Sequence, residues 1–115
     1  MPTRNQKYAS SAYENVKNVK DSEKSKYKTM TDKLPVLIHS AGLAQALSFV
    51  DAKANSSNEQ AWKLLLTHLA TTIGTDKNQL LERSRMAELA EYMKLTRDVL
   101  AALSWYKRFA QALLN

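Results

Sequence analysis

The chain of 115 residues contains no cysteine, only two glycines and only two prolines. The lack of cysteine excludes disulfides and cysteine-ligated metal sites, and it fits a reducing compartment. Because glycine and proline supply most turn chemistry, their scarcity argues against a fold built from hairpins. No apolar run approaches the roughly 18 residues of a membrane span, and the polar N-terminal stretch lacks the apolar core of a signal peptide. We therefore expect a cytoplasmic location.

Helix-forming residues are what the chain has in quantity. Leucine, alanine and lysine dominate a composition that is 44% hydrophobic and 24% charged, the balance expected of a globular protein. Apolar residues recur at spacings of three and four, which is typical of amphipathic helices. The sequence predicts an all-α fold in which residues 1–115 form a single compact domain. We expect a bundle of five to six helices with a long C-terminal helix.

The densest apolar segment outside the C-terminal helix covers residues 33–50. Pro35 lies inside its helical pattern, and a kink is expected there because proline lacks the N–H donor and crowds the preceding turn. Gly42 can adopt the positive φ that ends a helix. The pattern predicts a kinked helix, a glycine corner and a second, shorter helix that ends near Lys53.

Polar residues mark the other helix ends in the first half of the chain. Thr3 and Gln6 have the spacing of a capping box, which would open a first helix over residues 4–20. Ser22, in the polar break that follows, can cap the next helix, and Glu23 would lie in the first turn of that helix. A loop is expected at residues 54–58.

Three helices are expected after that loop. Ser57 and Gln60 have the spacing of a second capping box, and Gly74 would end the helix that they open. The apolar stripe of that helix is predicted to consist of Trp62, Leu65, Leu66, Leu69 and Ile73. Asp76 can then cap a short helix whose buried pair is Leu80 and Leu81.

The last helix is predicted to begin after a cap at Ser84 and to cover residues 85–114. Its core-facing stripe is expected to be Met86, Leu89, Ala90, Met93, Leu100, Leu103, Ala110 and Leu113. Ala101, Trp105 and Phe109 form a second apolar row. This row is either buried or a protein contact surface, and we favour burial because large aromatic side chains usually belong to cores.

Two blocks of sequence have a specific order and spacing when taken together. The first contains Tyr27, Leu34-Pro35, the apolar residues 36–38, Gly42-Leu43 and the alanine, leucine and phenylalanine of residues 46–49. The second is residues 91–97 followed by Ala101, Leu103, Trp105, Lys107, Arg108, Phe109 and Ala110. From about Tyr8 to its C-terminus, the chain resembles the small all-helical (fifth) subunit of the Cmr, or type III-B, CRISPR RNA-silencing complex.

The resemblance implies a non-catalytic subunit of an RNA-guided ribonucleoprotein in antiviral defence. Its partners would be the other subunits of the effector complex, further copies of itself in a stack, and the guide and target RNA. The copies would line the channel where the two RNAs pair, and neighbouring subunits would cut RNA.

The chain has a net charge of +6 and a sequence pI of about 9.6. Residues 1–35 contain eight Lys/Arg against four Asp/Glu, whereas the rest contain nine against seven. Such an excess attracts phosphate backbones in a salt-sensitive way, although a lysine-rich helix can also serve only solubility. The RNA-binding candidates are Lys17, Lys20, Lys24, Lys26, Lys28 and Lys33, with Arg83, Arg85, Lys107 and Arg108 as a second patch.

The residues for catalysis or metal binding are sparse. His39 and His68 are the only histidines, and neither has metal-ligand spacing. The two glycines stand far apart, so no glycine-rich phosphate loop exists, and the serines lack a nucleophile turn. We expect no catalytic residue, no cofactor and no metal. Tyr8, Tyr13 and Tyr27 fit the apolar stripes and are expected in the core.

Two other function classes fit a basic helical bundle. A helix-turn-helix DNA-binding protein could use the Gly42 corner, but residues 43–50 offer no charged row to read base edges. A protein adaptor could use Trp105 and Phe109 as anchors, in which case the positive charge would be incidental.

Overall fold

The protein is an all-α bundle in a computed structural model that describes residues 2–56 and 60–114. Its elements are α1 (Arg4–Lys17), the 3₁₀ turn η1 (Asp21–Glu23), α2 (Lys24–Ala41), α3 (Leu43–Ser56), α4 (Gln60–Ile73), α5 (Lys77–Met86) and α6 (Leu89–Leu113). No strand occurs in these residues, so the predicted fold class and the long C-terminal helix are confirmed. Within the described ranges no helix is both long enough and apolar enough to cross a membrane.

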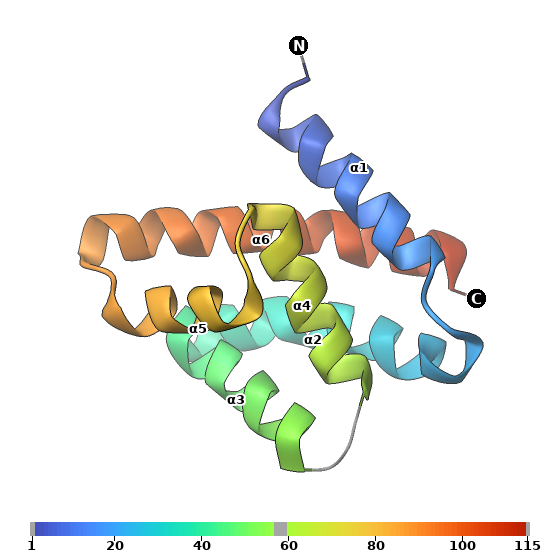
Figure 1. The fold of residues 1–115 in the computed structure, drawn as a ribbon, viewed down its shortest axis with the longest axis horizontal. Coiled ribbons are helices and arrows are strands. Elements are labelled where there is room, and N and C mark those ends of the chain that lie inside the picture. Colours follow the sequence, from blue (N-terminus) through green and yellow to red (C-terminus); the bar gives the residue numbers. More distant parts are fainter. Residues whose placement is uncertain (1, 57–59, 115) are drawn as a thin grey trace.

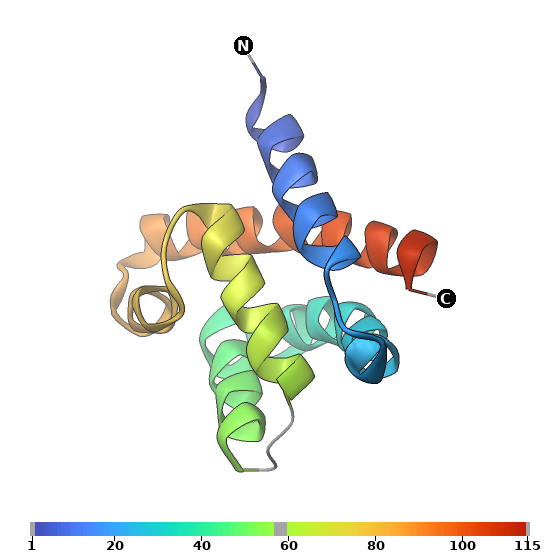
Figure 2. The ribbon, with the colours of Figure 1, turned by 45° about the vertical axis from the view of Figure 1, so that its right-hand side comes forward.

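Helix α6 is the spine of the molecule (Figure 1). Its 25 residues make a rod of about 38 Å at about 1.5 Å per residue. This is close to the longest dimension of the molecule, which measures 41 × 39 × 23 Å. Helices α1, α2 and α4 pack against α6, and α3 packs against α4 and α2. Figure 2 shows that α1 crosses one half of α6 while the other helices gather below it.

The central part of the core follows the apolar patterns of α2 and α4. Tyr27, Met30, Leu34 and Ile38 are buried on α2 at the predicted spacing. On α4 the predicted stripe is confirmed at its centre and half-buried at its ends. The short α5 buries its expected pair of leucines, and Asp76 caps it by accepting a hydrogen bond from the Gln79 N–H at 2.9 Å.

Gly42 forms the predicted corner between α2 and α3, with a φ of +88°. A Cβ atom at this position would lie 3.2 Å from the hydroxyl oxygen of Tyr92 on α6. That hydroxyl accepts a hydrogen bond from the Ala44 N–H at 3.1 Å, so it holds the first turn of α3 against α6. Helix α2 continues through Pro35 without ending, and the expected kink stays a prediction.

Three predicted boundaries in the first half were wrong. Helix α1 ends at Lys17 instead of residue 20, because the Asn18 side chain folds back to donate to the Glu14 carbonyl. Ser22 caps nothing, since it lies within the 3₁₀ turn that leads directly into α2. Helix α3 extends to Ser56, three residues past its predicted end. The second capping box involves Ser57, which lies outside the described residues.

The predicted start of the last helix was also wrong. Ser84 is buried inside α5, where its hydroxyl donates to the Leu81 carbonyl at 2.7 Å and cannot act as a cap. Helix α5 ends at Met86, Glu88 has an extended backbone, and α6 begins at Leu89. The break resets the helical phase, so apolar residues before and after it do not share one stripe.

The predicted core stripe of α6 holds only in part. Leu103 and Ala110 are buried and Leu100 is half-buried, but Met86, Leu89 and Met93 are 73%, 73% and 54% exposed. Ala90 and Leu113, the other two predicted members, are exposed as well. The buried face instead consists of Leu95, Asp98, Val99, Ala102, Leu103, Tyr106 and Ala110. The row of Ala101, Trp105 and Phe109 is half-buried against the core, which bears out the preference for burial in part.

Candidate nucleic-acid interface

The lysines of α2 lie on two different faces of that helix. Lys24 and Lys28 are four residues apart and line a shallow depression together with Leu114, beyond the end of α6. Lys26 lies on the other side, where it lines a depression with Lys53 and Trp62. Lys33 is seven residues farther along, about two helical turns, so it lies on the same face as Lys26. The run that looks continuous in the sequence is therefore not one patch.

The first of these faces is partly neutralised by acidic neighbours. The Lys24 ammonium lies 2.8 Å from the Asp21 carboxylate, and the hydrogen bond it donates lowers the pKa of Asp21 below its usual value. On the same side of α2, Asp32 lies 3.9 Å from the ammonium of Lys107 on α6. These exposed pairs contribute little to stability, but each one reduces the charge available to a phosphate.

A more favourable site for an anionic backbone lies between η1 and α4. Lys20 and Lys63 line one depression there, and both are exposed. Neither makes an ion pair with a described residue. The other lining residues are Asn18, Ser22, Glu23, Gln60, Leu64 and Thr67. Neutral hydroxyl and amide groups beside two ammonium groups are suited to phosphate and ribose contacts. We call this the Lys20–Lys63 depression.

The sequence prediction included Lys20 but missed Lys63. The two residues are far apart in the chain, and no spacing rule connects η1 to the polar face of α4. Lys17 lies three residues before Lys20, but its ammonium is engaged 3.2 Å from the Glu14 carboxylate and 5.6 Å from the centre of the Tyr13 ring. Tyr13 is 43% exposed, so the expectation of a core position fails for it, whereas Tyr8 and Tyr27 are buried.

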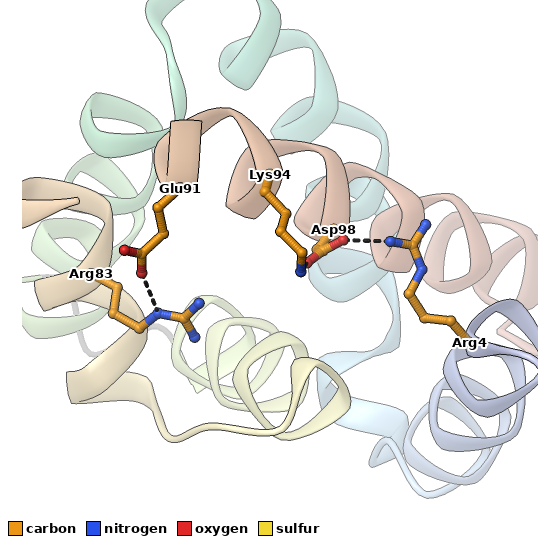
Figure 3. A network of polar contacts seen from close by, with 5 residues as sticks. All are labelled: Arg4, Arg83, Glu91, Lys94 and Asp98. Atoms are coloured by element: carbon orange, nitrogen blue, oxygen red, sulfur yellow. Dashed lines mark hydrogen bonds and ion pairs between the residues drawn. The ribbon is translucent and has the colours of Figure 1, made fainter. Parts of the chain in front are cut away.

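The predicted second patch does not form as one surface. Arg83 on α5 lies 3.6 Å from Glu91 in the first turn of α6 (Figure 3). Lys107 and Arg108 lie sixteen residues farther along the same helix, which corresponds to about 24 Å. Arg83 and Arg85 are thus separated from Lys107 and Arg108 by most of the spine.

An acidic residue that the sequence did not single out organises a separate network on α6. Asp98 is only 9% exposed at its side chain, and it accepts from Arg4 of α1 at 2.6 Å and from Lys94 at 3.1 Å (Figure 3). Burial of Tyr8 and the nearby Asp98 charge raise the pKa of the Tyr8 hydroxyl. This network links α1 to α6. It also engages Arg4 and Lys94, so these two cations are less available to RNA.

The two histidines have no arrangement that suggests chemistry. His39 is exposed on α2, whereas His68 on α4 is half-buried with its Nδ1 2.7 Å from the Tyr27 hydroxyl. Burial lowers the pKa of His68 to about 4, so the ring is neutral at physiological pH. The Tyr106 hydroxyl donates to the His68 carbonyl and accepts from the Asn15 side chain. Among the described residues, no three His, Asp or Glu side chains are grouped to hold a metal ion.

Comparisons with known proteins match the whole chain. The family described as "CRISPR-associated protein (Cas_Cmr5)" matches residues 4–113. The CRISPR system Cmr subunit Cmr5 of Thermus thermophilus is 47% identical over 117 residues, covering 100% of this chain and 99% of that protein. The chain belongs to the Cmr5 family. The crystal structure of a CRISPR-associated Cmr5 family protein from Thermus thermophilus has a TM-score of 0.88 and 45% identity, with complete coverage of both chains.

Membership of the Cmr5 family confirms the resemblance carried by the two sequence blocks, and the structure shows how those blocks meet. Gly42 belongs to the first block, and Ala44 lies two residues after it. Tyr92 of the second block accepts a hydrogen bond from the Ala44 N–H, and its hydroxyl lies beside Gly42. Lys107, also of the second block, pairs with Asp32 on the helix of the first. In this Cmr5-family chain the two blocks thus form the junction of α2, α3 and α6.

Proposed function

We propose that this chain is a non-catalytic subunit of a Cmr (type III-B) CRISPR effector complex that targets RNA in antiviral defence. It helps to assemble the complex, in which several copies stack beside the subunits that hold the guide RNA. It contacts guide or target RNA through lysine-to-phosphate interactions, and neighbouring subunits cut the RNA.

The observation that carries this proposal is the likeness, along the full length, to a curated protein named as a Cmr subunit. The identity of 47% extends over both whole chains, so the likeness is not confined to one shared motif. His68 has the setting of a core residue, since its Nδ1 lies 2.7 Å from the hydroxyl of the buried Tyr27 and burial lowers the pKa of its ring to about 4.

The Lys20–Lys63 depression is the part of the surface that best supports contact with RNA. It combines two cations with neutral hydrogen-bonding groups, and one acidic residue, Glu23, also lines it. All-helical proteins without an aromatic-bearing sheet lack the usual platform for reading single-stranded bases. The contact is therefore expected to be sequence-independent and to weaken with salt.

The assembly part of the proposal is tested by co-purification. The chain would be tagged in its own cells, and the proteins and RNAs that accompany it would be identified. We expect repeat-derived guide RNAs together with larger CRISPR subunits. A monomer that carries neither RNA nor protein would overturn the proposal.

The RNA contact is tested by charge reversal inside the purified complex. Lys20→Glu with Lys63→Glu should lower the affinity for complementary target RNA by about tenfold, because two cations of each copy are replaced by carboxylates that repel phosphate. Lys7→Glu with Arg97→Glu is the matched control, since both residues are exposed, lie on α1 and α6, and give the same change in net charge. Equal reductions in affinity for the two pairs would show that only net charge matters.

A protein adaptor remains the second candidate because the surface carries an apolar groove in addition to its lysines. The DNA-binding alternative has less support. Over residues 43–50, α3 exposes Gln45, Ser48 and Phe49, and these three side chains provide no row of charged or amide groups for base edges.

A further inference from the structure

We propose that the groove between α2 and α3 binds an amphipathic helix of another protein, whose apolar face enters the groove and whose carboxylates meet the lysines at one end. This inference names the chemistry of a protein partner, and it rests on the assembly part of the proposed function. The groove is defined by Val36, Leu37, Phe49 and Trp62 at its centre.

Three shallow depressions join to make this groove. The central one shares Leu37 and Phe49 with a depression that continues along the α2–α3 corner past Ala41 and Ala44. At its other end it shares Trp62 with a depression lined by Lys26 and Lys53. The groove therefore runs from an apolar end to a basic end. Its lining residues on α2 extend from Lys26 to Ala41, which corresponds to about 22 Å along that helix and is enough for several turns of a docked helix.

The groove exposes two large apolar side chains to solvent. Val36 is 67% exposed and Phe49 is 45% exposed, whereas most large apolar side chains of this chain are buried. The Phe49 and Trp62 rings pack edge to face with their centroids 5.9 Å apart, which fixes an apolar wall at the centre of the groove. Preformed aromatic surface of this kind is typical of protein contact sites.

Lysines supply all of the charged side chains among the described residues that line the groove. Lys26, Lys33 and Lys53 line it, and no Asp or Glu is among the described residues that line the three depressions. The Lys53 ammonium lies 5.8 Å from the centre of the Phe49 ring, so positive charge reaches the aromatic wall itself. A partner with carboxylates beside its apolar face complements this arrangement, and a basic partner is repelled.

The lining also argues against other classes of ligand. The central depression has a volume of about 330 Å³, at the low end of small-molecule sites, and offers few polar groups to orient a ligand. RNA bases can stack on aromatic rings, but they also need hydrogen-bond partners on their edges, and at the centre of the groove only Lys33 and Ser40 of the described lining residues have polar side chains apart from the Trp62 ring. The Lys20–Lys63 depression, with its amides and hydroxyls, suits RNA better.

The test uses Trp62 as the reporter in the full chain carrying Trp105→Phe, which removes the only other tryptophan. The probe is a synthetic amphipathic peptide of about 18 residues, long enough to be helical when docked, with leucines on one face and glutamates beside them at one end. A second peptide has lysines in place of the glutamates. We expect the Trp62 emission to shift on titration, with the glutamate peptide binding about tenfold more tightly.

Three variants make the assignment specific. Val36→Glu should abolish peptide binding, whereas Met86→Glu, the same kind of change at an exposed apolar residue far along the chain, should leave it intact. Lys53→Glu should reverse the preference between the two peptides. Lys53 is chosen because it is not an RNA-binding candidate, so this outcome is independent of the RNA contact. Circular dichroism checks that each variant keeps its helical content.

Each alternative occupant has its own signature. Equal affinity for both peptides, or equal loss of binding in Val36→Glu and Met86→Glu, would overturn the proposal. A uridine oligomer that displaces the peptide from Trp62 would assign the groove to RNA. Self-association that is abolished in Val36→Glu would assign it to a second copy of the chain. Peptide binding does not require the CRISPR complex, so its failure leaves the co-purification result intact and the reverse also holds.

Discussion

At the scale of single residues, Asp98 is one of the side chains that link α1 to the spine, together with Tyr106, which accepts a hydrogen bond from Asn15. Replacing it with asparagine keeps its size but removes the charge that Arg4 and Lys94 share. Hydrogen bonds to charged groups contribute about 1.5–3 kcal/mol, and both partners are largely exposed, so we expect Asp98→Asn to lower the free energy of unfolding by about 1–2 kcal/mol. Urea unfolding followed by circular dichroism measures this change.

Separate variants of Lys94 and Arg4 provide the controls for Asp98→Asn. Lys94→Ala should cost less than about 0.5 kcal/mol, because Lys94 is exposed and Arg4 still satisfies the carboxylate. Arg4→Ala should cost more than Lys94→Ala, since it also removes the link between two helices. An Asp98→Asn variant as stable as the parent would show that apolar packing alone holds α1 in place.

His68 gives the protein a specific pH dependence of stability. Burial lowers the pKa of His68 to about 4 from the ordinary value of 6.5, so below 6.5 the unfolded chain binds a proton that the folded chain does not. Stability from this residue is complete above about pH 6.5 and is lost as pH falls toward about 4. The expected loss is about 2 kcal/mol after allowance for partial solvent exposure.

The His68 prediction is checked by urea unfolding of three proteins at about pH 7.5 and about pH 4.5. His68→Gln keeps an acceptor for the Tyr27 hydroxyl but cannot titrate, so it should lose less stability than the parent on acidification. His39→Gln, the same change at an exposed histidine, should behave like the parent. Identical acid sensitivity in all three would mean that His68 titrates normally in the folded protein.

At the scale of helices and corners, Gly42 meets two constraints at once. Its positive φ disfavours any side chain, and an added Cβ would press on the Tyr92 hydroxyl. Gly74 also has a positive φ, but nothing lies within 4 Å of the position that its Cβ would occupy. Backbone strain of about 1–3 kcal/mol is expected for Gly→Ala at both, and Gly42→Ala should be the more destabilising because it also displaces Tyr92.

Thermal or urea unfolding of both glycine variants measures the difference. Combining Gly42→Ala with Tyr92→Phe isolates the contact, since the phenylalanine lacks the oxygen that the new methyl group would meet. The extra cost of Gly42→Ala should shrink in that background. Equal destabilisation at Gly42 and Gly74 would show that the α3–α6 junction adapts without cost.

The sequence predicted the core faces of helices whose buried residues repeat at one helical spacing, even where several helices cover that face. Helices α2 and α4 each bury one stripe, and the periodicity identified most of it. Helix α6 is covered by α1 on one side and by α2 and α4 on another, so its buried face is wide and includes Asp98 and Tyr106. Which residues of α6 face the core also depends on where the helix begins, after the break at residues 87–88. No glycine or proline marks that break in the sequence.

The candidate site was predictable in composition but not in arrangement. The lysines of α2 look like one basic run in the sequence, yet helical geometry divides Lys24 and Lys28 from Lys26 and Lys33. Lys63 joins Lys20 only through the packing of α4 beside η1. Three-dimensional neighbours of this kind are set by tertiary contacts, which local spacing does not encode.

At the scale of the whole molecule, the basic and apolar surfaces are proposed to act independently. The Lys20–Lys63 depression lies between η1 and α4, whereas the α2–α3 groove is centred on Phe49 and Val36. None of the described residues lines both. A protein that must hold RNA and a protein neighbour together benefits from this separation, because one contact does not exclude the other.

The salt dependence of RNA binding by the assembled complex tests this division of surfaces. Removing one phosphate-binding cation from a single-stranded RNA site should reduce the slope of log K against log salt concentration by about 0.7. Lys20→Ala with Lys63→Ala should therefore reduce the slope by about 1.4 for each copy that contacts RNA. Lys7→Ala with Arg97→Ala removes the same charge from other faces and should leave the slope unchanged.

The groove variant completes this test of the two surfaces. Val36→Glu should weaken assembly of the complex, because it places a carboxylate in the apolar centre of the groove. Complexes that do form should keep the parental slope, because the groove is not proposed to meet phosphate. A reduced slope in those complexes would instead place RNA in the groove, and the two surfaces would then be parts of one RNA-binding face.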